Sequence, residues 1–340
     1  MKIAIDCRYI GMSGMGTVCR GLIEHLDYGE NDYYLIGKKE LLKNFPCAKI
    51  IEDNTAPYSR KGFFSFCREL NRVCDALIVP NFFIPFGVKI PVYIVMHDLI
   101  FLDLPKITTR GTYDYLLKKF LIKRGMKRAE KVFCVSGFTK SRCEFYFPKY
   151  ADKCIVDYIG VSDEVINFNT EGIEKTNSVI YVGNVKSHKG IKTLITAFSM
   201  LPKDKFVLKI IGEREGFLTG LKEDLNEEGV VFTGRLDSKV LMKEIASAAF
   251  LVQPSLYEGF GLPPIEALAL GTRPIISDIP VFKEIYKDLP VVFFRADDAE
   301  DLKNAILTAD IKLPLNAEYE AEQYNFSKFA DKMISNITRR

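Results

Sequence analysis

Short apolar runs rich in β-branched side chains alternate along the chain with longer segments of helical spacing. Each run is bounded by glycine, proline or polar residues, which predicts a strand buried on both faces of a parallel sheet. In the first half these runs are residues 2–6, 33–37, 76–80, 92–98, 131–136 and 154–160; in the second half they are 179–184, 206–212, 230–234, 249–255, 273–278 and 291–294. Two such series predict an α/β protein with two doubly wound, Rossmann-like domains.

A polar and acidic stretch without strong periodicity, residues 162–178, separates the two series of strands. A stretch of this kind is typical of a linker between domains. We therefore expect an N-terminal domain over residues 1–162, a linker over 163–177 and a C-terminal domain over 178–322.

The last residues, 323–340, carry apolar side chains at a spacing of three or four, namely Phe326, Phe329, Met333 and Ile337. This spacing predicts one helix with a single apolar stripe. Because the stripe needs a surface that buries it, we expect the helix to pack back toward the N-terminal domain.

The composition fits a soluble globular protein and narrows the classes of partner. Of 340 residues, 48% are hydrophobic and 27% charged, and the net charge is only +3, so we expect no nucleic-acid partner. Asp6 and Arg8 interrupt the first apolar run before a secretory signal forms, and no apolar run is long enough to span a bilayer. The eight cysteines include no C-x-x-C pair, which favours reduced core residues of a cytosolic protein.

The stretch PSLYEGFGLPPIEALALG, residues 254–271, places Glu258 and Glu266 around glycines and two prolines. It follows a predicted strand, and we expect a loop and then a helix that runs to Leu270, with Pro264 and Glu266 in its first turn. Ligands of open α/β sheets lie beyond the carboxyl ends of strands, where this loop falls. Glycines let the backbone approach a phosphate, and carboxylates accept hydrogen bonds from sugar hydroxyls.

A second candidate group, Lys186, His188 and Lys189, follows the strand that ends near Gly183. Basic groups at this place neutralise a diphosphate through charge-assisted hydrogen bonds. Each group also has a structural interpretation: Glu266 as a helix-start residue, Glu258 as a solvated loop charge, and the lysines as a solvated basic turn.

In the first half, His97 follows an apolar strand, a place where a histidine often has a purely structural role. The glycines Gly11, Gly14 and Gly16 after the first strand do not satisfy G-x-G-x-x-G, so a dinucleotide dehydrogenase is a weak alternative. We interpret Ser136 and Thr139 as helix-capping residues.

Together these motifs resemble the retaining glycosyltransferases of family 4, which have the GT-B fold: two Rossmann-like domains that face an interdomain cleft. Glu258 and Glu266 match the E-x7-E signature of that family. The similarity covers nearly the whole chain, in the order GMSGMG at 11–16, HDL at 97–99, VSGFTKS at 135–141, GNVKSHKG at 183–190, TGRLD at 233–237 and DIPVFKEI at 278–285.

The resemblance implies that the second domain binds a nucleotide-diphosphate sugar. Glu266 would hold the ribose hydroxyls, Glu258 the transferred sugar and Lys189 the diphosphate, while His97 would contact the sugar from the first domain. The remaining donor-binding positions implied are Gly14, Gly16, Asn184, Arg235, Gly259, Phe260, Gly261 and Leu262. Asn184 departs from the family, in which many members have arginine, and Lys186 or His188 is the expected replacement.

The implied function is retaining, metal-independent transfer of a hexose from a GDP- or UDP-linked donor to a glycan or lipid-pyrophosphate-linked acceptor. No cofactor is expected, and the chain has no Asp-x-Asp metal motif. The motifs are similar to those of bacterial surface-polysaccharide enzymes (O-antigen, capsule and lipopolysaccharide assembly), including mannosyltransferases. The alternative is a non-catalytic nucleotide-sugar-binding protein on the same scaffold.

A basic segment with interspersed aromatic residues, 106–131, carries nine basic and two acidic side chains. Such a segment suits contact with anionic lipid headgroups, although it also fits a solvated helix face. We therefore expect a cytoplasmic protein, and peripheral contact with the inner face of the cytoplasmic membrane is a hypothesis.

Overall fold

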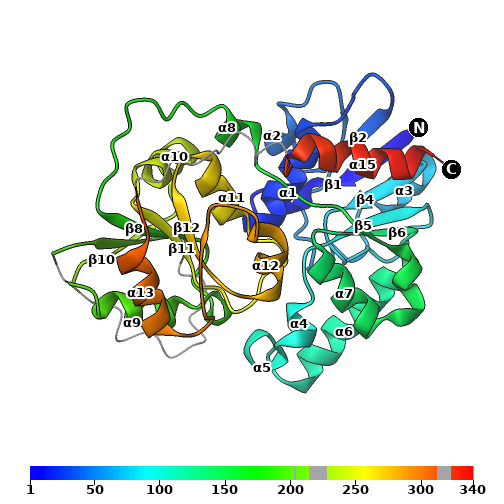
Figure 1. The fold of residues 1–340 in the computed structure, drawn as a ribbon. Coiled ribbons are helices and arrows are strands. Elements are labelled where there is room, and N and C mark those ends of the chain that lie inside the picture. Colours follow the sequence, from blue (N-terminus) through cyan, green and yellow to red (C-terminus); the bar gives the residue numbers. More distant parts are fainter. Residues whose placement is uncertain (203, 214–227, 312–322, 340) are drawn as a thin grey trace. The chain divides into compact units, whose positions relative to one another are not determined.

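The computed structural model describes residues 1–202, 204–213, 228–311 and 323–339. The chain forms two compact units, one of Met1–Ile159 with Asn325–Arg340 and the other of Gly160–Tyr324 (Figure 1). The segment that we expected as a linker, 163–177, therefore belongs to the second unit. The expected boundary at residue 322 lies outside the described residues.

The first unit contains a seven-stranded parallel sheet with the order β3-β2-β1-β4-β5-β6-β7. The order reverses between β1 and β4, as in a doubly wound fold. The strands are β1 (Lys2–Asp6), β2 (Asp32–Gly37), β3 (Lys49–Glu52), β4 (Ala76–Val79), β5 (Val92–Met96), β6 (Lys131–Cys134) and β7 (Cys154–Val156).

Helices connect these strands, and the final helix of the chain joins this unit. The helices are η1 (Cys7–Tyr9), α1 (Ser13–Glu24), α2 (Lys39–Leu42), α3 (Cys67–Val73), α4 (Ile100–Asp103), α5 (Pro105–Thr108), α6 (Thr112–Arg128), α7 (Gly137–Tyr146), η2 (Pro148–Lys153) and α15 (Phe326–Thr338). Helix α15 packs on α1 (Figure 1): a Cβ at Gly21 would lie 2.4 Å from Cγ of Phe326. Its predicted apolar stripe is buried at all four positions.

The second unit contains a six-stranded parallel sheet with the order β10-β9-β8-β11-β12-β13. Its strands are β8 (Ser178–Val182), β9 (Val207–Ile211), β10 (Val230–Gly234), β11 (Phe250–Gln253), β12 (Arg273–Ser277) and β13 (Val292–Phe294). Its helices are α8 (Asp163–Ile166), η3 (Ser187–Lys189), α9 (Ile191–Ser199), α10 (Ser238–Ser247), α11 (Leu262–Ala269), α12 (Pro280–Tyr286) and α13 (Ala299–Thr308).

The two sheets confirm the predicted α/β class. The central strands β1, β4, β5, β11 and β12 are buried along almost their whole length, because helices cover both faces of a doubly wound sheet. Within the described ranges, no helix combines the length and the apolar character that crossing a bilayer requires.

Candidate functional site

The strand order of the second unit reverses between β8 and β11, which are direct neighbours in the sheet. Side chains that follow these two strands therefore meet at one edge, where doubly wound sheets bind their ligands. The loop after β8 ends in η3 with Lys189, and the loop after β11 carries Glu258.

Backbone contacts hold these two loops together. Leu256 N–H donates to the His188 carbonyl oxygen at 2.8 Å. Gly190 has a left-handed φ of 67°, and a Cβ there would lie 1.9 Å from the Pro254 carbonyl oxygen. Only glycine permits this approach, so Gly190 sets the distance between the loops.

Lys189 and Glu258 form an ion pair between the two loops. The lysine Nζ lies 2.7 and 2.8 Å from the two carboxylate oxygens, and the side chains are only 21% and 11% exposed. Ser255 Oγ donates to the same carboxylate at 2.7 Å, and Gln253 Nε2 donates at 3.3 Å. Burial alone would raise the pKa of Glu258, but Lys189 and Ser255 outweigh it and hold that pKa below its usual value.

Glu266 lies nearby in sequence but in a different environment. Burial raises its pKa to about 7, and within the described ranges its carboxyl group has no hydrogen-bond or ion-pair partner. Because the residue is only partly buried, its carboxyl group stays accessible to a ligand that offers hydrogen-bond donors. The site therefore offers one charged, paired carboxylate and one that is unpaired and readily protonated.

The expectation that Glu266 lies in the first turn of its helix is wrong. Helix α11 begins at Leu262, so Pro264 lies in its first turn as predicted, whereas Glu266 falls in the second turn. Gly261 precedes the helix with a left-handed φ of 85°, a conformation that glycine adopts readily.

The chain around Gly261 is fixed by aromatic residues. A Cβ at Gly261 would lie 2.5 Å from Cε1 of Phe282, and the Tyr286 hydroxyl donates to the Gly261 carbonyl oxygen. Phe260 is buried and meets Tyr324 edge to face, with ring centroids 5.5 Å apart. The Phe260 ring thus anchors the loop, while the partly exposed Leu262 begins the helix.

In the first unit, His97 follows β5 and is held at two points. Its Nε2 lies 2.9 Å from the Pro80 carbonyl oxygen, and Thr139 Oγ1 donates to the His97 carbonyl oxygen at 3.1 Å. Burial lowers the pKa of His97, so the ring is neutral near pH 7. Because a carbonyl only accepts, Nε2 carries the proton, and Nδ1 is left as an acceptor.

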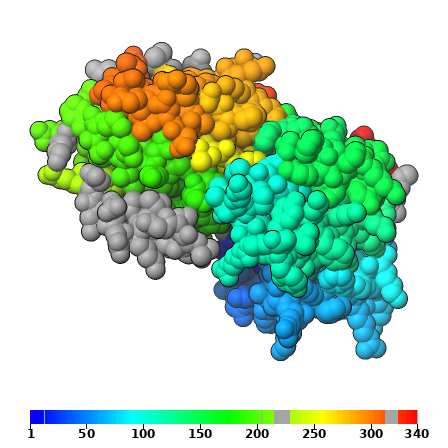
Figure 2. Space-filling model, turned by 90° about the horizontal axis from the view of Figure 1, so that it is seen from below, coloured from blue at the N-terminus to red at the C-terminus, as the bar shows by residue number. Residues whose placement is uncertain are grey.

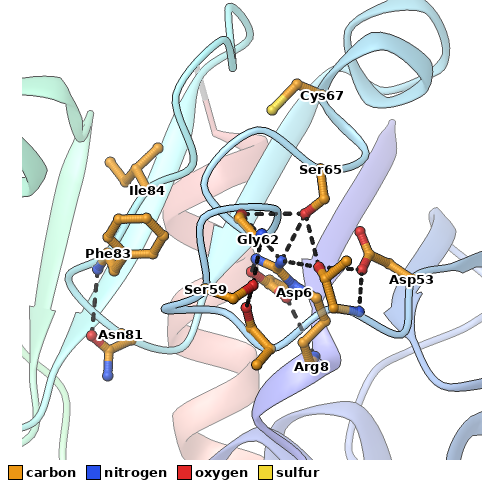
Figure 3. Close-up of polar contacts among 12 residues, drawn as sticks. Asp6, Arg8, Asp53, Ser59, Gly62, Ser65, Cys67, Asn81, Phe83 and Ile84 are labelled. Atoms are coloured by element: carbon orange, nitrogen blue, oxygen red, sulfur yellow. Dashed lines mark hydrogen bonds and ion pairs between the residues drawn. The ribbon is translucent and has the colours of Figure 1, made fainter.

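The loop after β1 rests on a buried ion pair that the sequence analysis did not identify (Figure 3). Arg8 makes a bidentate contact with Asp6, at 2.8 and 2.7 Å, and also donates to Ser65 Oγ at 2.8 Å. Its remaining acceptors are Thr55 Oγ1 and the Gly62 carbonyl oxygen. This network joins the end of β1 to residues 55–65.

The other predicted donor-binding residues occupy varied positions. Gly14 and Gly16 lie in the first turns of α1 rather than in a loop; Gly14 is exposed, whereas a Cβ at Gly16 would lie 2.9 Å from the Tyr9 carbonyl oxygen. Asn184 accepts from Tyr181 through its backbone. Arg235 follows the edge strand β10, with a side chain 69% exposed and 4.0 Å from Glu213. Ser136 caps α7 by accepting from Thr139 N–H, as predicted.

A model of the family described as Glycosyl transferases group 1 matches residues 163–323. O-antigen chain mannosyltransferase RfbU of Salmonella typhimurium is 31% identical over 192 residues, which cover 55% of this chain and 53% of that protein. O-antigen chain mannosyltransferase B of Escherichia coli is 25% identical over 229 residues, covering 63% and 59%. The alignments thus span little more than half the length of these curated relatives.

Two solved structures are similar to the whole chain. WaaG, a glycosyltransferase involved in lipopolysaccharide biosynthesis, matches with a TM-score of 0.76 at 14% identity, covering 99% of each chain. HepE of Anabaena, in complex with UDP and glucose, matches with a TM-score of 0.74 at 15% identity, covering 100% of each chain. At such low identities the similarity concerns the fold.

Proposed function

We propose that this protein transfers a sugar from a nucleotide-diphosphate donor, because residues 163–323 match the model of the group 1 glycosyltransferases and the fold is similar to those of WaaG and HepE. The acceptor proposed is a glycan or a lipid-linked glycan, and the configuration at the transferred sugar carbon is retained. The observation that carries the proposal is the Lys189–Glu258 pair between the loops after β8 and β11, with Glu266 following in α11.

The donor roles follow from charge and hydrogen-bonding capacity. Lys189 is the cation of the site, and a diphosphate with two negative charges competes for it against Glu258. When Lys189 turns to the diphosphate, the Glu258 carboxylate is released to accept hydrogen bonds from sugar hydroxyls. Glu266, unpartnered in the free protein, accepts those of the ribose.

Transfer with retention proceeds in this proposal by substitution on one face of the sugar. The departing diphosphate takes the acceptor proton while positive charge develops on the sugar ring. Lys189 and the N-terminus of α11 stabilise the departing charge, and Glu258 stabilises the charge on the ring. His97 contributes its free Nδ1 as an acceptor for a sugar hydroxyl, held in place by Pro80 and Thr139.

The specific sugar is proposed from the relatives. Two of them are named as O-antigen chain mannosyltransferases, so we assign a GDP-mannose donor and a place in surface-polysaccharide assembly in the cytoplasm. UDP-linked donors are the competing class, since HepE was solved with UDP and glucose. A thermal-shift comparison of GDP with UDP, followed by their sugars, decides between them, and a shift with UDP alone would reverse the assignment.

No metal ion has a role in the proposed transfer, because Lys189 and helix N–H groups carry out the charge neutralisation for which other glycosyltransferases use a divalent ion. The test is donor turnover with and without EDTA. Unchanged turnover supports the proposal, and loss of turnover that Mg²⁺ or Mn²⁺ restores contradicts it.

Contact with an anionic membrane is proposed for residues 106–131, which lie on the surface shown in blue-green in Figure 2. Four apolar side chains of α6 are exposed at helical spacing, namely Tyr113, Leu116, Leu117 and Phe120. Exposed lysines stand beside them at positions 119, 123 and 127. An apolar stripe flanked by lysines matches an interfacial helix. Failure to bind anionic liposomes at low salt would remove this proposal.

The second candidate function is a binding protein that holds a nucleotide sugar without transferring it. The paired Glu258 and the tethered His97 favour an enzyme, because simple binding does not require them. A chain that binds nucleotide sugars but neither hydrolyses nor transfers any of them would favour the binding protein.

A further inference from the structure

Three cysteine side chains from three different elements meet inside the first unit. Cys134 ends β6, Cys154 begins β7 and Cys143 lies in α7. In the parallel pairing of β6 with β7, Cys154 lies opposite Val132. Because side chains two residues apart on a strand share a face, Cys134 and Cys154 both point to the face that α7 covers. The three sulfurs all lie within 4.8 Å of one another.

The sulfurs are buried, with residue exposures of 0%, 0% and 5% in chain order, and they belong to the apolar core of the unit. Their hydrogen bonds are long: Cys134 Sγ lies 3.9 Å from Cys143 Sγ, and Cys154 Sγ lies 3.7 Å from the Tyr150 carbonyl oxygen. The three thiols therefore meet in a water-poor part of the core, where a thiophilic ion would find three sulfur ligands together.

The spacing suits an ion with three sulfur ligands. With bonds of about 2.3 Å, the length of a zinc–thiolate bond, a planar trigonal ion holds its sulfurs about 4.0 Å apart and a pyramidal ion about 3.4–3.5 Å apart. The separation between Cys134 and Cys143 lies between these values, at 3.9 Å. The widest separation, at most 4.8 Å, closes to the pyramidal spacing when each of the two sulfurs moves by less than about 1 Å.

The apolar surroundings favour an ion whose complex with the three sulfurs carries no net charge. A divalent ion bound by three thiolates has a net charge of −1, which is costly to bury without a countercharge. Arsenite differs, since As(OH)₃ and three thiols form As(SR)₃ and three waters, with every species neutral and no change of oxidation state. We propose that Cys134, Cys143 and Cys154 form a binding site for a trivalent thiophilic metalloid, with arsenite as its representative.

The experiment loads the reduced, purified full chain with sodium arsenite in a phosphine reductant, removes the excess and measures bound arsenic per chain. We expect one arsenic per wild-type chain and a raised melting temperature. Cys134→Ala, Cys143→Ala and Cys154→Ala should each bind at least ten-fold less arsenic at limiting arsenite, because only two sulfurs remain. Cys19→Ala removes an equally buried cysteine outside the cluster and should bind as the wild type does.

X-ray absorption of the loaded wild-type protein keeps the test decisive if a variant fails to fold. Three sulfur neighbours around arsenic, unchanged in Cys19→Ala, support the proposal. Two sulfur neighbours, a wild type that binds no stoichiometric arsenic, or any folded variant of the three that binds normally would overturn it. Each of those results would indicate that the three thiols serve only as small core residues.

Discussion

Glu258 lies where an isolated carboxylate would be poorly solvated, and Lys189 supplies its countercharge. Breaking such a pair from one side leaves an uncompensated charge, whereas replacing both partners removes the problem. The pair is therefore a stability element of the free protein as well as the proposed donor site. A double-mutant cycle distinguishes the contribution of this pair to stability from its contribution to the proposed donor site.

Lys189→Met should lower the free energy of unfolding by about 1–3 kcal/mol, because Glu258 loses its countercharge. Adding Glu258→Gln should restore most of that stability without restoring sugar transfer. Urea unfolding and donor turnover of the two single variants and the double variant measure both effects. Additive losses of stability in the double variant would show that the two side chains are not coupled.

Glu266 makes stability depend on pH, because its pKa is about 7 in the folded protein and about 4.3 in an unfolded chain. The folded state thus holds the proton to higher pH than the unfolded state does. The contribution of Glu266 to the free energy of unfolding is fully present below about pH 4 and is lost as the pH rises through 7. The total loss is about 1–3 kcal/mol.

Glu266→Gln is the matched control, since glutamine does not titrate. The difference in unfolding free energy, wild type minus Glu266→Gln, should fall between pH 5 and 8, as followed by denaturant titration at each pH. A difference that stays constant over this range would mean that Glu266 is already ionised in the folded state. Glu266→Gln should also weaken nucleotide binding more than it lowers the turnover rate.

At this scale the sequence predicted roles for Glu258, Glu266 and Lys189, of which the structure brings Lys189 and Glu258 together. It did not predict the direct Lys189–Glu258 contact, because that contact depends on how closely Gly190 lets two separate loops approach. It also missed Ser255 and Gln253, since short polar residues beside a strand have no distinctive spacing. The Asp6–Arg8 pair was noticed only as an interruption of an apolar run.

At the scale of elements, the contact between the loops after β8 and β11 is the feature that places the site residues. Gly190→Ala should both strain a left-handed backbone and push its Cβ into the Pro254 carbonyl oxygen, 1.9 Å away. We expect a loss of at least about 2 kcal/mol of unfolding free energy and a loss of nucleotide affinity.

Gly271→Ala is the matched control, because Gly271 has a similar φ of 72° but nothing within 4 Å of its Cβ position. Gly271→Ala should lower the free energy of unfolding only through backbone strain, by about 1 kcal/mol, and should leave nucleotide affinity unchanged. Chemical unfolding and nucleotide titration of both variants give the comparison. Equal effects of the two substitutions would mean that the approach of the loops is unimportant.

The predicted strands were found at their places because buried parallel strands carry continuous apolar runs. Strand β3 was missed, since Lys49–Glu52 is a short edge strand with only two apolar residues. The helix α8 was missed within the acidic segment, where four residues give no periodicity. Glu266 was placed one turn too early in α11, because the sequence pattern did not locate the start of the helix directly after Gly261.

At the scale of the whole molecule, His97 belongs to the first unit, whereas Lys189, Glu258 and Glu266 belong to the second. The topology of both sheets was predictable from alternating strands and helices. The attachment of α15 to the first unit followed from its apolar stripe together with the family resemblance.

His97→Gln should retain stability, because the glutamine amide still donates to the Pro80 carbonyl oxygen, yet turnover should fall about 100-fold or more. For His97→Gln the loss of activity should appear as a lower kcat, whereas for Glu266→Gln it should appear as a higher KM. Steady-state kinetics together with melting temperatures distinguish the two. A melting temperature that falls in parallel with activity would make His97 a structural residue.

The central claim is that the loops after β8 and β11, with the Lys189–Glu258 pair between them, turn over a nucleotide sugar. Its most direct measurement is the release of nucleoside diphosphate from GDP-mannose and from UDP-glucose by the purified chain, beside Glu258→Gln. We predict measurable release by the wild type from one of these donors and at least a 100-fold lower rate in the folded variant. No release from either donor, or equal rates in the two proteins, would contradict the claim.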